Sequence, residues 1–470
     1  MIPLNRKHLA RCLATLAVAL TLAGCTTYNQ QNKFAQYYVQ SDLVNAEKEA
    51  TKKAEDKQDG KDEIIWRLEQ ATILRAAGKY QESNKAFDRA EARIDKYAEE
   101  AKVKLGNEAG AILSNQANLP YRGRAYDGIM LNTYKSLNYL QLGQPDKARV
   151  EITRAYIRQQ DAVEENKKRI EKAQEEAEQS KAKANIEKAR QDEKFKGQLE
   201  GGFAELNTLK PYADYVNPFT VYLEGLYYMA CSTGLPDLEK SRQAFQRVSA
   251  YTADNKFVKA DQDTLAALVQ GQEFPPTTYV IFETGRGPMR DQLRIDIPII
   301  ITDVSYVGAA FPRIKFQDNF TPNLVVTAGG VSETTLPVAS MDSVVGQDFK
   351  HELPTIITKT LVSTITKAVA AYAVNHAAMQ SDAVLGWVAR IGTAVAQASV
   401  NIADLRTWTT LPKEFQICRV PTPADRRIEL HSPSSSPTIP VTIGEGTVNV
   451  VFVKSISATG PLLVSQIKLK

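Results

Sequence analysis

The feature that constrains the fold most is a change of hydrophobic period at Phe274-Pro275-Pro276. From about residue 41 to 270, apolar residues recur every three or four positions, as in helices. From 276 to 470, apolar and polar residues alternate in short runs separated by glycine-containing loops, as in strands. Two adjacent prolines interrupt any helix that crosses the junction. The sequence therefore predicts an α+β protein with two separate folding units, a helical domain at 41–270 and a β-rich domain at 276–470.

The N-terminus has the pattern of a bacterial lipoprotein signal. Residues 1–24 contain three basic residues and no acidic one, with an apolar run at about 13–22 that is too short for a stable transmembrane span. The run ends in the lipobox Leu22-Ala23-Gly24-Cys25. We expect cleavage before Cys25 and acylation of its thiol. The alternative is an ordinary secretory signal that is cut nearby, in which Cys25 has no role.

Acyl chains on Cys25 would hold the protein on a membrane, since each buried methylene contributes about 0.8 kcal/mol. Thr26 follows the cysteine, at a position where aspartate is typical of lipoproteins retained in the inner membrane. By resemblance to that sorting rule, we expect a lipid anchor in the outer membrane, with the protein facing the periplasm. Residues 25–40 are polar and rich in Gln and Asn, which predicts a short lipidated tether.

Charge and cysteine content narrow the possible partners. The formal net charge is +4, and the three basic residues of the signal leave +1 for the mature chain. Such a chain has no electrostatic bias towards nucleic acid. Of the four cysteines, only Cys231 and Cys418 remain after cleavage and acylation. They fall in different predicted domains, which favours two buried thiols over a structural disulfide.

Three stretches of the helical part share a design of helix, glycine-containing turn and helix. The first contains Trp66, Gly78-Lys79-Tyr80 and Phe87, the second turns at Gly143-Gln144-Pro145, and the third turns at Gly234. Small residues would let paired helices approach, and aromatic residues would fill the gap between pairs, as in tetratricopeptide repeats. The alternative is a helical bundle without repeats. Both predict antiparallel helix pairs, but only repeats predict a continuous concave groove.

Two further helical segments are predicted outside these repeats. Residues 161–200 are dense in charge, with acid-first pairs one turn apart, which predicts a solvated helical arm. A partner-binding coiled coil is the alternative for this arm. Apolar runs at about 342–377 and 382–402 predict a two-helix insertion in the β-rich domain. We expect it to be buried against the sheet, because charged residues interrupt the apolar surface that a membrane-touching hairpin would need.

The sequence lacks the familiar motifs of metal and nucleophile chemistry. The histidines of the mature chain, His351, His376 and His431, do not form a His-Glu-x-x-His pair, and no Cys-x-x-Cys, Gly-x-Ser-x-Gly or phosphate-binding loop occurs. We expect no metal and no cofactor, and we assign no catalytic residue. Catalysis by paired carboxylates leaves no spacing signature, so an enzymatic activity stays open.

Charges, glycines and a predicted turn coincide in the run Glu283–Asp291. A carboxylate at Glu283 beside the guanidinium groups of Arg286 and Arg290, on an exposed hairpin loop, would be able to bind a polar ligand or a partner. The alternative is a charged, solvated loop with no ligand. In the run 403–412, we expect Asp404 to pair with Arg406 and Trp408 to anchor the helical insertion.

Several motifs carry a resemblance to a known family. They are the lipobox, Asn217-Pro218-Phe219, Phe282-Glu283 before Gly285 and Pro288, and Ala403-Asp404-Leu405-Arg406-Thr407-Trp408 with Leu411-Pro412. Together they resemble an uncharacterised family of proteobacterial lipoproteins with tetratricopeptide-like helices, over most of the mature chain. The family is associated with gene neighbourhoods that encode a lipoprotein of the penicillin-binding-protein activator type. The resemblance implies a role in cell-envelope assembly and gives no residue a chemical role.

These observations predict a non-enzymatic adaptor or scaffold of the cell envelope. Acyl chains on Cys25 would bind the membrane, and the helical repeats would bind an envelope protein within about residues 60–260. The β-rich domain would supply a second contact or reach peptidoglycan. We expect the Glu283 loop to contribute little, because exposed ion pairs are weak. The alternative is an envelope enzyme or carbohydrate-binding protein with its site in the β-rich domain.

Overall fold

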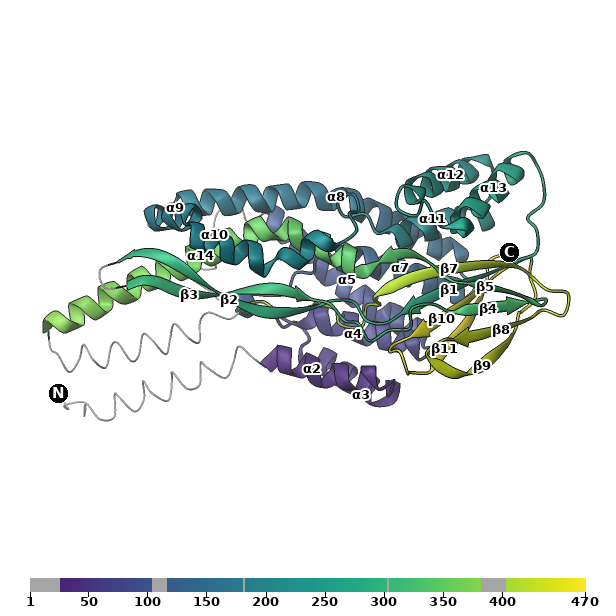
Figure 1. The fold of residues 1–470 in the computed structure, drawn as a ribbon, viewed down its shortest axis with the longest axis horizontal. Coiled ribbons are helices and arrows are strands. Elements are labelled where there is room, and N and C mark those ends of the chain that lie inside the picture. Colours follow the sequence, from purple (N-terminus) through teal and green to yellow (C-terminus); the bar gives the residue numbers. More distant parts are fainter. Residues whose placement is uncertain (1–25, 104–115, 181, 302–303, 382–402) are drawn as a thin grey trace.

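The structure is a computed structural model that describes residues 26–103, 116–180, 182–301, 304–381 and 403–470. Helices and β-sheets combine in one elongated body, which confirms the α+β class (Figure 1). The signal at 1–24, the lipid attachment residue Cys25 and the second inserted helix expected at about 382–402 lie outside the described residues. Within the described part of the chain, no helix is long and apolar enough to cross a membrane.

Helix pairs occupy the three stretches expected to fold as helix, turn and helix. They are α4 (Glu63–Ala76) with α5 (Tyr80–Val103), α7 (Ala125–Gln141) with α8 (Pro145–Glu178), and α11 (Pro218–Ala230) with α12 (Leu235–Ser249). Gly78 and Gly143 make the first two turns with φ of 76° and 66°, a conformation that glycine adopts without steric cost. Successive pairs contact each other, α5 on α7 and α8 on α11, and α13 (Lys256–Val269) packs on α12.

The segment expected to be a polar tether is instead a helix, α2 (Thr26–Val39), followed by α3 (Leu43–Asp56). Phe34 and Tyr38 of α2 are at most 1% exposed, and the Phe34 ring packs edge-on against Trp66 with 5.9 Å between centroids. Gln31 Nε2 donates to the carbonyl oxygen of Thr407 at 2.9 Å. Hydrophobic periodicity did not predict this helix, because its buried face has few apolar residues and the segment is rich in Asn and Gln.

The charged arm is a hairpin that packs on the body. The long helix α8 runs along the body, and α9 (Lys183–Gln191) and α10 (Glu193–Gly202) turn back below it (Figure 1). Ala173 and Ala177 of α8 and Ile186 and Ala189 of α9 are buried, and α9 and α10 contact strand β2 (Met289–Ile301). The outer face of the arm is therefore solvated, while its inner face packs on β2.

The strands form three sheets. The largest has the order β11-β10-β1-β7-β6, the second has the order β5-β4-β8-β9, and the third pairs β2 with β3. The bounds are β1 (Thr277–Thr284), β3 (Val304–Lys315), β4 (Val325–Ala328), β5 (Val331–Thr334), β6 (Leu336–Ser340), β7 (Glu414–Pro421), β8 (Arg427–Ser432), β9 (Ser435–Thr442), β10 (Val448–Ser455) and β11 (Leu462–Lys468). β1 is central, parallel to β10 and antiparallel to β7, and all of its residues are buried.

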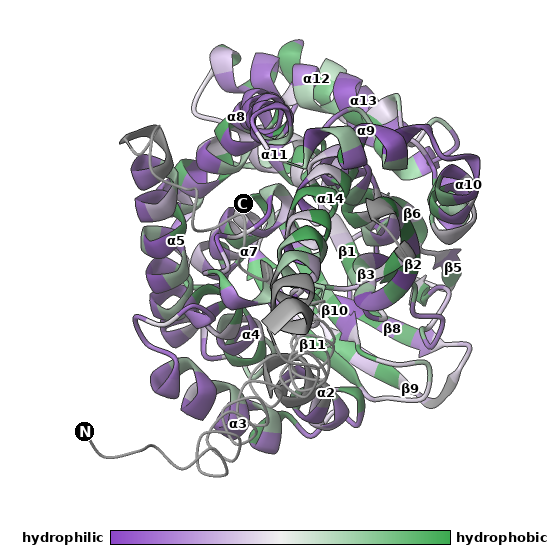
Figure 2. Ribbon diagram, turned by 90° about the vertical axis from the view of Figure 1, so that its left-hand side faces the viewer, coloured by the Kyte–Doolittle hydropathy of each residue, from purple (hydrophilic) through white to green (hydrophobic). Residues whose placement is uncertain are grey.

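The first of the two inserted helices is α14 (Met341–Ser381). It contacts α8 and β3, so a helix inserted between strands packs on the helical part of the chain as well as on a sheet. Figure 2, viewed along the long axis of the molecule, shows α14 near the centre with the other elements around it. The expectation that this helix is buried is confirmed for its described residues Leu361, Val362 and Ile365.

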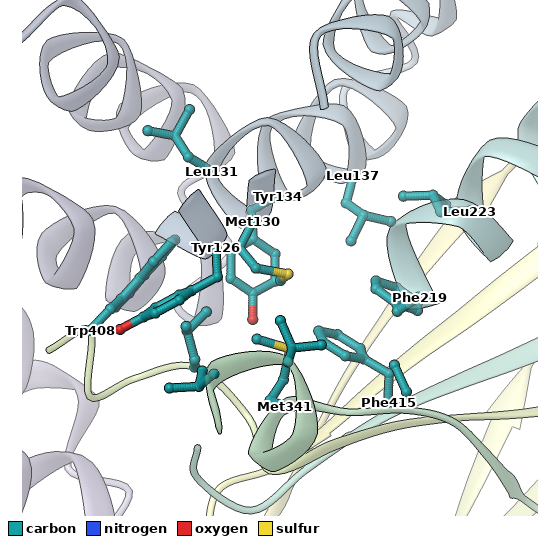
Figure 3. Close-up of a cluster of buried hydrophobic side chains, with 14 of the residues drawn as sticks. Tyr126, Met130, Leu131, Tyr134, Leu137, Phe219, Leu223, Met341, Trp408 and Phe415 are labelled. Atoms are coloured by element: carbon teal, nitrogen blue, oxygen red, sulfur yellow. The ribbon is translucent and has the colours of Figure 1, made fainter. Parts of the chain in front are cut away.

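Helices and sheet share one hydrophobic core. Phe219 of α11 stacks flat on Phe415 of β7, with 3.8 Å between ring centroids and 2° between planes. Figure 3 shows Met130 and Tyr134 of α7 in the same cluster as Met341 and Trp408. The double proline therefore separates two sequence patterns but not two cores, and we no longer expect residues 41–270 and 276–470 to fold independently.

Candidate binding cleft

Glu283 lies in the interior of the protein and not on an exposed loop. It is the penultimate residue of the central strand β1, where it is 1% exposed and lies directly opposite Lys454 of β10. Its Oε1 accepts a hydrogen bond from the Tyr134 hydroxyl at 2.7 Å and forms an ion pair with the Lys454 ammonium. A buried carboxylate of this kind depends on such partners, because an unpaired charge in the core is costly.

The other two residues of the expected site, Arg286 and Arg290, form hydrogen bonds with other side chains and not with Glu283. Arg286 is half-buried and donates from Nη2 to Gln317 Oε1 at 3.1 Å. Arg290 is 3% exposed and donates from Nη2 to Glu352 Oε2 at 2.6 Å. Glu283, Arg286 and Arg290 therefore have separate partners, and the structure does not gather them into one site.

The expectation of an exposed loop fails because the turn after β1 is covered. The backbone N–H of Gly287 donates to the carbonyl oxygen of Leu411 at 2.7 Å, so the turn hydrogen-bonds to the segment that leads into β7. At Gly285, whose φ is 68°, an added Cβ would lie 2.5 Å from the Cβ of Phe320. These glycines permit a close approach of chain segments rather than an open ligand loop.

An open cleft of about 380 Å³ lies between the first helix pair and the edge of the five-stranded sheet. One side is formed by the end of α4 and the turn into α5, and the other side by β10 and the first residues of β11. Glu283 also lines the cleft. The lining residues are Thr72, Arg75, Ala76, Ala77, Gly78, Tyr80, Glu283, Phe452, Lys454, Leu462, Leu463, Val464 and Ser465.

Arg75 lines the cleft and is not among the residues that the sequence predicts to form a site. It is 7% exposed, and its guanidinium lies between two rings, 5.3 Å from the centroid of Tyr134 and 4.6 Å from that of Phe452. Its Nη1 donates to Asn138 Oδ1 at 2.9 Å. Among the residues that the structure describes, Arg75 forms no ion pair with a carboxylate. In the sequence, Arg75 is recognisable only as a basic residue at helical spacing from Leu68 and Thr72, on the same face of α4.

The cleft carries a surplus of positive charge. Burial by itself lowers the pKa of Lys454, but the Glu283 carboxylate and the Tyr38 hydroxyl together hold that pKa above its ordinary value. Lys454 and Glu283 therefore neutralise each other, and the Arg75 charge is left over. Because a buried charge without a counter-ion is unfavourable, the cleft favours an anionic group beside Arg75.

The connection between α14 and β7 holds α4 beside the sheet and so shapes the cleft. Oε1 of Glu69 on α4 accepts from the backbone N–H of Thr409 at 2.8 Å and from its hydroxyl at 2.7 Å. Oε2 of Glu69 accepts from the Thr410 hydroxyl at 2.7 Å. Trp408 Nε1 donates to Thr72 Oγ1 at 3.0 Å. Trp408 thus anchors this connection, which follows the helical insertion, to the first two helix pairs.

The expected pairing of Asp404 with Arg406 is confirmed, and the expectation of two buried thiols is confirmed for Cys418, whereas Cys231 is partly exposed. Arg406 Nη2 lies 2.7 Å from Asp404 Oδ2, the expected ion pair, and Arg406 Nη1 reaches Asp62 Oδ1 on the helical side at 2.9 Å. Cys231 and Cys418 are free thiols. Burial raises the pKa of Cys231 to about 11 and that of Cys418 to about 12, which makes both thiols poor nucleophiles.

Glu69→Gln is expected to flatten the dependence of stability on pH. Burial raises the pKa of Glu69 from 4.5 to about 7, so the folded protein binds a proton there that the unfolded chain releases. Stability from this group is therefore full below about pH 4.5 and is lost as pH rises to about 7, by roughly 3 kcal/mol. Glutamine mimics the protonated acid and removes this loss. Urea unfolding of both proteins at pH 4.5 and pH 7 measures the difference, and parallel pH profiles would contradict the assignment.

Comparisons with known proteins do not assign a function to the cleft. Searches of protein-family models, curated proteins and solved structures found no match to this chain. The resemblance to the lipoprotein family stays a prediction. Among the side chains that the structure describes, no group of three His, Cys, Asp or Glu residues is placed to hold a metal ion.

Proposed function

We propose that the protein is a lipid-anchored adaptor of the bacterial cell envelope that binds a segment of a partner protein in the cleft between its helices and its five-stranded sheet. One observation carries the proposal. The cleft is open, is built jointly by the first helix pair and the sheet edge, and combines the Arg75 cation with apolar walls such as Phe452 and Leu463. Mixed walls of this kind suit protein segments, which offer both apolar side chains and charges.

The arrangement of the helix pairs supports the repeat interpretation within this proposal. Each pair contacts the next, as neighbouring tetratricopeptide repeats would. In the third pair, an added Cβ at Gly225 would lie 2.9 Å from the Phe245 ring, so glycine permits the close approach of α11 and α12. Small residues at such contacts are a property of the repeat design.

The anchor would place the cleft close to the membrane. Tyr38 on α2 lies 5.8 Å, ring centroid to ammonium, from Lys454 of the cleft. It is thirteen residues after Cys25, which is about 20 Å along a helix that rises about 1.5 Å per residue. Because acylated Cys25 would directly precede a helix that packs on the body, the cleft would lie near the membrane surface. With an anchor in the outer membrane, a bound partner would lie on the periplasmic side, where peptidoglycan is also within reach.

The alternative of a glycan-processing enzyme is less well supported. Such enzymes use two carboxylates that flank one cleft. The cleft described above has one carboxylate in its lining, Glu283, and its Oε1 already binds Tyr134 and Lys454. An adaptor needs no second acid, which is why we favour it.

The proposal is tested by partner capture with matched variants. The acylated full-length protein is purified from detergent-solubilised membranes as wild type, Leu463→Glu or Val331→Glu, and co-purifying proteins are quantified by mass spectrometry. Leu463 lines the cleft, whereas Val331 is 63% exposed on the edge strand β5 of the other sheet. We expect the same envelope protein with wild type and Val331→Glu, and its loss with Leu463→Glu. Equal capture by all three folded proteins would refute the assignment of the cleft.

A further inference from the structure

The cleft is bordered by a sheet edge that pairs with no further strand among the described residues. β11 is the last strand of the five-stranded sheet and pairs with β10 alone. On its other side, no backbone hydrogen bond joins Leu462–Lys468 to any described residue. A strand edge presents unpaired N–H and C=O groups, and native proteins usually protect such edges with charges, prolines or bulges.

The part of β11 that lines the cleft lacks that protection. Leu462, Leu463, Val464 and Ser465 are all half-exposed and carry no charge. Lys468 is the only charged residue of the strand, and it lies at the far end from the cleft. The open edge and its apolar side chains therefore coincide with the cleft.

The buried cation supplies the second, independent observation. Arg75 is more than nine-tenths buried, lines the same cleft, and has a neutral amide, Asn138, as its hydrogen-bond partner. Two rings hold the guanidinium in place, so little side-chain freedom would be lost when it binds an anion. A planar guanidinium can bind a carboxylate through two parallel hydrogen bonds.

We propose that the cleft binds an extended peptide segment that adds a strand to the edge of β11 and places a carboxylate on Arg75. This inference rests on the proposed adaptor function and names the form of the partner. Four residues of β11 line the cleft, which at about 3.4 Å per residue gives room for roughly four residues of added strand. Backbone hydrogen bonds supply affinity in such complexes, while side-chain pockets and the carboxylate supply specificity.

A free anion or a lipid headgroup would fit these observations less well. Either would explain an unpaired cation, but neither carries the regularly spaced N–H and C=O groups that a strand edge matches. A peptide satisfies the edge, the apolar side chains and the cation together. The carboxylate can be that of an acidic side chain or of a chain terminus, and the experiment below separates these sources.

The test uses peptides selected on the full-length acylated protein. The protein is placed in nanodiscs of phosphatidylethanolamine and phosphatidylglycerol, and a library of random peptides with free C-termini is selected against it. Selected peptides are then made with a fluorophore in three forms: unchanged, amidated at the C-terminus, and with Asp or Glu replaced by Asn or Gln. Fluorescence anisotropy measures their affinity. We expect one of the two neutralised forms to bind about tenfold more weakly or worse, which identifies the source of the carboxylate.

A double-mutant cycle locates the carboxylate on Arg75. Arg75→Gln should weaken the unchanged peptide about as much as neutralising the peptide does, and should not weaken the neutralised peptide further. Arg247→Gln, in a partly exposed arginine of α12, is the control and should leave affinity unchanged. If Arg75→Gln does not fold, the comparison of peptide forms on the wild-type protein still tests the need for a carboxylate.

Hydrogen exchange distinguishes strand addition from other binding. Bound peptide should slow amide exchange at residues 462–465 and leave the outer edge strand β5 unchanged. Failure to select any peptide, indifference to both neutralisations, or protection confined to sites outside β11 would overturn the inference. If capture of an envelope protein still depends on Leu463 in any of those cases, the adaptor function stands and only its peptide form is wrong. If that dependence is absent as well, both fail.

Discussion

Trp408→Ala is expected to lower the free energy of unfolding by about 3 to 5 kcal/mol, the cost of truncating a large core aromatic. Trp408 is 1% exposed, and its ring packs edge-on against Phe87 of α5 and Tyr134 of α7, each with 5.9 Å between centroids. Its Nε1 donates to hydroxyls of Thr72 and Thr410. Truncation would leave a cavity and remove these contacts between the helices and the segment that enters β7.

The same variant tests whether helices and sheet form one cooperative unit. Urea unfolding is monitored in parallel by two methods. Far-ultraviolet circular dichroism reports the helices, and hydrogen exchange reports β1 and β10. Because the core is shared, both signals should shift to lower urea together. Trp408→Phe keeps most of the ring packing and should cost less. A shift of the sheet signal alone would show that the helical part is stable without Trp408 and would contradict the shared core.

Cys25→Ser is expected to abolish lipid attachment completely. A serine hydroxyl lacks the thiol to which the acyl group is transferred, and the lipobox places no other cysteine at that position. Metabolic labelling with an alkyne fatty acid, followed by capture of the label, measures acylation. Without acyl chains the protein loses the anchor energy of about 0.8 kcal/mol per buried methylene, so it should leave the membrane fraction.

Cys12→Ser is the matched control, because it removes a thiol from the same N-terminal segment without changing the lipobox. This variant should be labelled like the wild type. Fatty-acid label on Cys25→Ser at the wild-type level would refute the lipoprotein assignment, and with it the envelope location on which the proposed function depends.

The sequence predicted features whose partners are near in the chain. The change of period at the double proline marked the start of the sheets, and glycines marked the helix turns. The ion pair of Asp404 with Arg406 was predictable because the two residues are only two positions apart in the chain. Periodicity and short spacing report local structure, so these expectations hold wherever tertiary packing agrees with them.

The features of the cleft depend on contacts that are distant in the chain. Glu283 meets Lys454 from 171 residues away, and Glu69 meets Thr409 from 340 residues away. No local pattern shows that β10 pairs in parallel with β1, which is what buries Glu283 instead of exposing it. Arg75 was overlooked because a cation on a helix face is usually solvated, whereas here Tyr134 and Phe452 enclose it.

Site-specific photo-cross-linking in living cells shows directly whether an envelope protein occupies the cleft. A benzophenone amino acid replaces Leu463 in the cleft or, as the control, the exposed Val331 on β5. The protein is otherwise wild type and acylated, and adducts are identified after irradiation. We expect an adduct with one envelope protein from position 463 and none with that protein from position 331. Absence of any adduct at 463 in correctly folded, membrane-bound protein, or the same adducts from both positions, would contradict the proposed role of the cleft.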